Sequence, residues 1–103
     1  MVNLDDRRKG FEAKWVHDAD LRFKIEARRN RALGAWAAAA KGLSGPAAED
    51  FILTVIAADF QEVGDEDVFR KLRAELDSGL FPDAVIRARM AEELEAAAAA
   101  LAT

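Results

Sequence analysis

The sequence predicts an all-α fold, a four-helix bundle with an N-terminal arm that is flexible or helical on binding. Apolar residues make up 51% of the 103 residues, and a large share of them are Ala, the best helix former. Tyr and Cys are absent, Pro occurs twice, and β-branched residues are scarce outside residues 51–56. Such a composition disfavours strands. A chain of this length is expected to form one domain with one modest core.

The first long helix-forming segment runs from Asp5 to Ala40. As one continuous helix it would be about 54 Å long. A compact domain of this size is only about 35 Å across, so part of the segment must overhang. Gly10 and the charge pattern divide it near His17. We therefore expect an arm at residues 1–17 and a bundle at residues 18–103.

The arm carries two aromatic residues, Phe11 and Trp15, whose spacing of four places them on one stripe of a helix. Gly10 interrupts this helix at a cost of about 1 kcal/mol relative to Ala. One interpretation is that the arm becomes helical when both rings enter a groove of a partner. The alternative is that both rings fold back onto the bundle as ordinary core.

Four helices are expected in the bundle, at about 18–41, 45–63, 66–78 and 82–101. Gly42 is a natural C-cap of the first, Ser44 and Asp65 are N-caps of the second and third, and Pro82 starts the fourth. Short connections favour antiparallel neighbours. The second helix is apolar around most of its circumference and is expected to be the central, most buried one. The residues expected in the core are Phe23, Leu33, Trp36, Phe51, Val55, Ile56, Phe60, Val68, Phe69, Leu72, Leu76, Ile86, Met90 and Leu94.

Charge is distributed unevenly along the chain, whose net value is −4. Residues 1–31 hold nine Lys and Arg against six acids, and the remainder holds six basic residues against thirteen acids. An overall acidic protein is a poor ligand for nucleic acid. The basic cluster Arg28, Arg29 and Arg31 is therefore expected to form ion pairs with the acidic third helix, in preference to binding phosphate.

Chemistry-bearing motifs are sparse, and we expect no enzyme, no cofactor and no metal. The lone His17 has no catalytic partner in sequence. The acidic run at 65–67 begins like a calcium loop, but Arg70 and Leu76 stand where the Gly and the bidentate Glu would be. Ser78 follows Asp77 as in carrier proteins, but Gly79 comes next and the pair ends a helix. The absence of Cys, of a signal peptide and of a long apolar run favours a cytoplasmic protein.

Several short blocks together resemble the zeta subunit family of alphaproteobacterial F1Fo ATP synthases. The resemblance covers nearly the whole chain and is weakest beyond Asp77. The blocks are Asp5-Asp6-Arg7, Phe11-Glu12-Ala13-Lys14, His17-Asp18, Ala27-Arg28-Arg29-Asn30, Leu33-Gly34, Trp36-Ala37-Ala38, Ala58-Asp59-Phe60 and Gly64-Asp65-Glu66-Asp67-Val68-Phe69-Arg70-Lys71.

The resemblance implies a non-enzymatic inhibitor of F1 that binds its α, β and γ subunits, at the inner membrane only through the synthase. Its arm, from Val2 to His17, would enter a catalytic α/β interface near the central stalk and block hydrolysis. Trp15 departs from the Phe or other apolar residue expected in relatives. The alternative functions are a helical adaptor of another complex and a carrier-like protein modified on Ser78. The residues implied to contact the partner are Leu4, Asp5, Asp6, Arg7, Arg8, Phe11, Lys14, Trp15 and His17, with Phe11 and Trp15 as apolar anchors and Arg7, Arg8 and Lys14 as ionic contacts.

Overall fold

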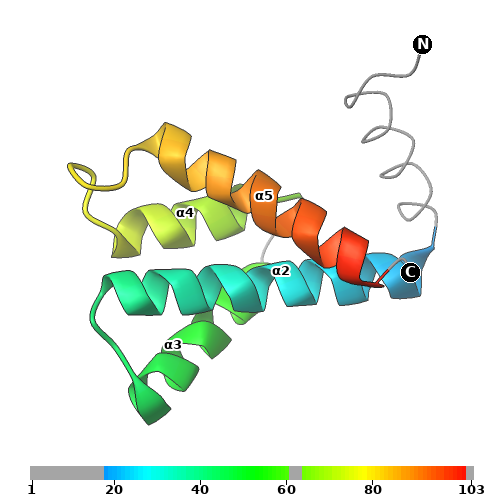
Figure 1. Ribbon diagram of the computed structural model, residues 1–103, viewed down its shortest axis with the longest axis horizontal. Coiled ribbons are helices and arrows are strands. Elements are labelled where there is room, and N and C mark those ends of the chain that lie inside the picture. The colour runs from blue at the N-terminus through cyan, green and yellow to red at the C-terminus, as the bar shows by residue number, and fades with distance from the viewer. Residues whose placement is uncertain (1–17, 61–63, 102–103) are drawn as a thin grey trace.

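The computed structural model describes residues 18–60 and 64–101, and within these residues it confirms the predicted all-α fold (Figure 1). The four helices of this part are α2 (Ala19–Ala40), α3 (Gly45–Ala58), α4 (Glu66–Glu75) and α5 (Asp83–Leu101). The helix α2 lies along the longest axis, with α5 and α4 on one side of it and α3 on the other (Figure 1). The predicted arm lies outside the described residues.

The helix α2 is the centre of the bundle, because it packs against α3, α5 and, less extensively, α4. Its start is fixed by Asp18, whose carboxylate accepts a hydrogen bond from the Leu21 backbone N–H at 3.0 Å. Gly42 follows its end with a φ of 76°, a left-handed conformation that Gly adopts without strain. The prediction that the second helix would be central is wrong. That helix, α3, leaves Leu53 half exposed.

One main core joins the C-terminal half of α2 to the other three helices. Most of the residues expected in the core are in it and are buried. Gly34 lets α3 approach closely, since a Cβ placed there would lie 3.0 Å from the Ile52 Cα. Trp36 is half-buried against this core, with its ring edge-on to Phe81. The main core consists of Leu33, Ala37, Ala38, Phe51, Val55, Val68, Phe69, Leu72, Leu76, Ile86 and Met90.

A second, smaller cluster joins the N-terminal half of α2 to the C-terminal half of α5. Its buried members are Ile25, Ala97 and Ala98, and the half-buried Leu21, Leu94 and Leu101 pack against it. Leu94 therefore contributes to this cluster and not to the main core. Two of its three buried members are Ala, and its Leu side chains are only half-buried, so the cluster buries less apolar area per residue than the main core.

Two aromatic residues expected in the core lie at the surface instead. Phe23 is 56% exposed and Phe60 is 70% exposed. The helix α3 ends at Ala58, five residues earlier than predicted, so Phe60 lies beyond the helix and does not continue its buried face. Phe23 belongs to a stripe of α2 that is rotated away from the stripe containing Ile25. Ile56 is half-buried, between the core and the surface.

The helix α4 also ends earlier than predicted, at Glu75. Leu76 adopts an extended conformation with φ −107° and ψ 142°, yet its side chain is buried in the main core. The Arg73 guanidinium closes this end by donating to the carbonyl oxygens of Leu76 at 2.9 Å and Phe81 at 2.7 Å. Neither Ser44 nor Asp65 makes the predicted side-chain capping bond, although each occupies the N-cap position.

Candidate functional site

A buried polar cluster holds the end of α3 and the start of α4 against α2. We call Arg29, Asn30, Asp59 and Asp65 the Arg29 cluster. Arg29 and Asn30 are each only 1% exposed. The Arg29 Nη1 donates to Asp65 Oδ1 at 2.7 Å, and its Nη2 lies 3.6 Å from Asp59 Oδ1. Asn30 accepts from Arg29 Nε at 3.0 Å and donates from Nδ2 to Asp59 Oδ2 at 2.9 Å.

This cluster lies where α3 ends and α4 begins. Asp59 is the C-cap residue of α3, and its carboxylate is turned toward α2 by Asn30 and Arg29. Burial raises the pKa of the Asp59 carboxyl, while the hydrogen bond from Asn30 and the charge of Arg29 oppose that rise. A buried Arg requires such partners, because an unpaired buried charge is strongly destabilising. The cluster thus fixes the positions of two helix ends at once.

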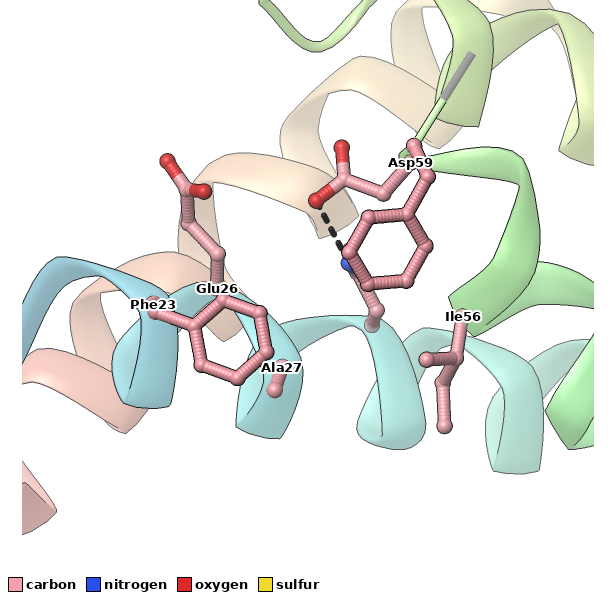
Figure 2. Close-up of a pocket in the computed structure, with 7 residues that line it drawn as sticks. Phe23, Glu26, Ala27, Ile56 and Asp59 are labelled. Atoms are coloured by element: carbon pink, nitrogen blue, oxygen red, sulfur yellow. Dashed lines mark hydrogen bonds between the residues drawn. The ribbon is translucent and has the colours of Figure 1, made fainter. Parts of the chain in front are cut away.

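Beside the cluster, α2 and the C-terminal end of α3 form a surface groove of about 230 Å³ (Figure 2). We call it the α2–α3 groove. Its two aromatic rings, Phe23 and Phe60, lie with their centroids 6.3 Å apart and their planes at 38°. The groove is lined by Phe23, Glu26, Ala27, Asn30, Ile56, Asp59 and Phe60.

Glu26 supplies a carboxylate beside the aromatic pair. Burial raises the pKa of Glu26, and the charges of Asp59 and Asp65 raise it further, while Arg29 and Arg22 act in the opposite direction. The groove therefore combines apolar rings with a carboxylate that is partly removed from water. Such a surface favours a cationic and aromatic ligand over an anionic one.

The groove is smaller than the sites that usually enclose small molecules, which are about 300–1,000 Å³. The described residues hold no group of three His, Cys, Asp or Glu side chains placed to bind a metal ion. Within residues 18–60 and 64–101, no helix has the length and apolar character needed to cross a membrane.

The predicted basic cluster separates into three different environments. Arg29 is buried and pairs with Asp65, the N-cap residue of α4. This pair is the kind of contact that was expected between the basic cluster and the acidic third helix. Arg31 instead pairs with Glu49 of α3 through two hydrogen bonds of 3.0 and 3.2 Å. The Arg31 bond lowers the pKa of the Glu49 carboxyl. Arg28 is exposed.

Ser78 and Asp67, which were considered from the sequence as possible functional residues, have structural roles in a turn and at a helix start. Ser78 lies in the turn between α4 and α5, after a helix and not at the start of one, unlike the serine of carrier proteins. Asp67 is buried, and its carboxylate accepts from the Val68 N–H at 2.8 Å. All nine residues implied to contact a partner, from Leu4 to His17, lie outside the described residues.

A family model described as ATPase inhibitor subunit zeta matches residues 1–100. The chain belongs to this family. The resemblance seen in the sequence blocks is thereby confirmed, and the match spans both the predicted arm and the four helices. Searches of curated proteins and of solved structures found no match to this zeta-family chain.

Two features of this zeta-family chain were not found by sequence reasoning, namely the Arg29 cluster and the α2–α3 groove. A signal for the first was present, since Arg29 stands four residues from both Ile25 and Leu33 and hence on their buried stripe. The groove had no comparable signal. Its lining comes from two helices and depends on where α3 ends, which contacts distant in sequence determine.

Proposed function

We propose that this zeta-family chain inhibits ATP hydrolysis by F1 and that residues 1–17 are the inhibitory element. The family match carries the proposal, because it includes both this segment and the helical bundle. In the proposed mechanism the segment enters a catalytic α/β interface and reaches toward the γ subunit of the central stalk. Residues 18–103 serve as the base. The protein acts without catalysis of its own, from the cytoplasmic side of the inner membrane, to which only the synthase holds it.

The residue types of the segment support this role. Phe11 and Trp15 are the apolar anchors, and Arg7, Arg8 and Lys14 are the ionic contacts. Aromatic and Arg side chains dominate the energetics of protein interfaces because they bury large areas and form several contacts each. Ordering a short segment in a closing cleft costs conformational entropy, which the burial of both rings must offset.

The direction of rotation gives the inhibition its asymmetry. Hydrolysis and synthesis turn the rotor in opposite senses, so one of them closes the cleft around the segment and the other opens it. A segment held in a closing cleft blocks rotation in that direction and is released in the other. Inhibition is therefore expected to be stronger for hydrolysis than for synthesis.

The decisive measurement is the inhibition constant for F1 hydrolysis with the double variant Phe11→Ala and Trp15→Ala. Loss of two buried anchors should raise the constant at least about 30-fold, equivalent to about 2 kcal/mol. The matched control is Leu53→Ala with Leu80→Ala, which removes two exposed apolar side chains from the bundle and should leave the constant unchanged. An unchanged constant in the Phe11 and Trp15 variant would count against these anchors.

Deletion of residues 2–17 tests the segment as a whole. The shortened chain should keep its helical circular dichroism and lose its inhibition of hydrolysis. Equal inhibition by the shortened chain would show that the bundle itself is the inhibitor. A pull-down from native membranes distinguishes inhibition from the adaptor alternative, because recovery of complexes without the α, β and γ subunits would favour an adaptor.

A further inference from the structure

The α2–α3 groove exposes an aromatic pair at the surface of the described bundle. Phe23 and Phe60 come from different helical regions, yet their rings lie 6.3 Å apart. Each is more than half exposed, although isolated Phe side chains are normally buried. Ala27 and Ile56 extend the apolar surface along the groove (Figure 2). Clustered apolar surface rimmed by polar groups is typical of a binding site for another segment.

The polar rim of the groove is acidic. Within residues 18–60 and 64–101, no ion pair or hydrogen bond engages the Glu26 carboxylate. Arg29 does not neutralise it fully, because its guanidinium is held by Asp65 at 2.7 Å and Asp59 at 3.6 Å. Burial raises the pKa of Glu26, so a cation placed beside it would stabilise its charged form. A fitting ligand therefore carries Lys or Arg close to aromatic side chains.

We propose that the α2–α3 groove is a docking site for residues 7–15 of the same chain. This stretch reads Arg-Arg-Lys-Gly-Phe-Glu-Ala-Lys-Trp, with four basic residues, one acid and two aromatic rings. Its formal charge of +3 is opposite to that of the rim. Phe11 and Trp15 supply rings for the exposed aromatic pair, and Lys14 lies between them in sequence to meet Glu26.

The chain length between the two parts permits this contact. Measured along α2 from Asp18, Phe23 is about 7.5 Å away and Asn30 about 18 Å, at 1.5 Å per helical residue. Trp15 lies three residues before Asp18, and Phe11 lies seven residues before Asp18. At about 3.3 Å per extended residue, these reach about 10 and 23 Å respectively. Trp15 can thus reach Phe23, and Phe11 can reach the far end of the groove.

Docking within one chain requires only weak intrinsic affinity. A short tether gives an effective concentration in the millimolar range, so even a contact of about 1 mM affinity is substantially occupied. A docked segment is unavailable to F1, so the apparent affinity for F1 equals the intrinsic affinity multiplied by the undocked fraction. This regulatory consequence rests on the proposed function, whereas the docking itself does not.

Photocrosslinking of the full chain tests the docking directly. Benzoylphenylalanine is placed at position 11, the free protein is irradiated at low micromolar concentration, and the crosslinked peptides are mapped by mass spectrometry. We expect crosslinks at monomer mass to peptides that contain residues 23–27 or 56–60. Crosslinks scattered over the bundle would overturn the proposal. Crosslinks found only at dimer mass would also overturn it, since they would assign the groove to a second copy.

Variants of the groove supply the matched comparison. The double variant Phe23→Ala and Phe60→Ala should lower the mapped crosslink at least about fivefold, and Glu26→Gln should lower it less. The control Leu80→Ala removes a 75% exposed apolar residue in the α4–α5 turn and should leave the crosslink unchanged. Because both Phe residues are exposed, the double variant should keep its helical circular dichroism. An undiminished crosslink in this folded variant would overturn the proposal.

Measuring how strongly the same variants inhibit F1 allows the docking proposal and the proposed inhibitory function to be tested independently. If docking competes with F1, the Phe23 and Phe60 variant should inhibit hydrolysis about three- to tenfold more strongly than the wild type. A weaker inhibition would instead make the groove a contact surface for F1 and would contradict the competition between docking and F1 binding. If the wild type does not inhibit F1 at all, the proposed function fails, while the crosslink still decides whether the segment docks.

Discussion

The two halves of α2 are held in the bundle by different forces. The C-terminal half contributes Leu33 and Ala37 to the main core, where large side chains from the other three helices surround them. The N-terminal half contributes Ile25 to a small cluster of mostly Ala residues and Leu side chains. It also carries Arg29 and Asn30, which form directional bonds to the ends of α3 and α4. Apolar contact supplies stability at one end, and a polar network fixes geometry at the other.

The difference between the halves determines where the candidate site lies. Aromatic rings next to a core of large apolar side chains become buried in it, because burial of each ring is favourable. Around the polar half, the Arg29 cluster occupies the space between the helices, and Phe23 and Phe60 remain outside it. The polar half is therefore the end of α2 at which an aromatic surface is available to another segment.

The largest effect on stability is expected in the apolar half. Leu33 is fully buried, and Leu33→Ala would remove three side-chain carbon atoms and leave a cavity between α2 and its neighbours. The free energy of unfolding should fall by about 4 kcal/mol, measured by urea denaturation followed by circular dichroism. Leu53→Ala, at a half-exposed position of α3, is the control and should change stability by less than about 0.5 kcal/mol. Similar losses for the two variants would contradict the assigned core.

A somewhat smaller effect is expected in the polar half. Arg29→Met keeps an unbranched side chain but leaves Asp59, whose side chain is 15% exposed, without its countercharge. The free energy of unfolding, measured by urea denaturation, should fall by about 3 kcal/mol. This value is at the lower end for breaking a buried ion pair, because the half-exposed Asp65 can be solvated by water once Arg29 is removed. Arg28→Met is the matched control at an exposed position.

A second substitution tests the cause of that loss. Adding Asp59→Asn to Arg29→Met removes the unpaired charge and should recover part of the stability. If Arg29→Met alone were as stable as the wild type, the polar network would not be needed to hold α2, and the contrast between its halves would fail.

Within residues 18–60 and 64–101, the number, order and approximate positions of the helices could be predicted from the sequence because helix formers, caps and apolar stripes are local signals. The buried stripe of the first helix was predicted only in part. Leu33 was expected in the core, but Arg29 and Asn30 interrupt the apolar pattern of that stripe, and their burial was not expected. Phe23, which was also expected in the core, lies on a different stripe of this helix and is 56% exposed. Similarly, the contact of Asp59 with Asn30, 29 residues away in sequence, accompanies the early end of α3 and leaves Phe60 exposed.

The candidate site was less predictable than the fold. A groove that needs Glu26 from one helix and Phe60 from beyond the end of another has no local pattern. The residues implied for partner binding, in contrast, all lie at positions 1–17 and remain a prediction. Sequence reasoning thus identified the segment proposed to act, whereas the structure supplied the surface proposed to hold it.

The smallest effect, and the one that locates the boundary between the halves, is expected at Gly34. A Cβ there would lie 3.0 Å from the Ile52 Cα and 3.2 Å from its Cγ1, so α2 and α3 must separate slightly to accept it. Ala is favoured over Gly in a helix by about 1 kcal/mol, which offsets part of the overpacking cost of about 1–3 kcal/mol. Gly34→Ala should therefore lower the free energy of unfolding by about 1 kcal/mol.

The neighbouring residue, Ala35, provides the control for the direction in which Gly34→Ala changes the free energy of unfolding. Ala35 is exposed on the same helix, so Ala35→Gly reports the helix propensity alone and should also cost about 1 kcal/mol. At an open position Ala is thus the more stabilising residue, and at position 34 the order is reversed by the backbone of Ile52. If Gly34→Ala raised the urea midpoint instead, α2 and α3 would not be in tight contact there.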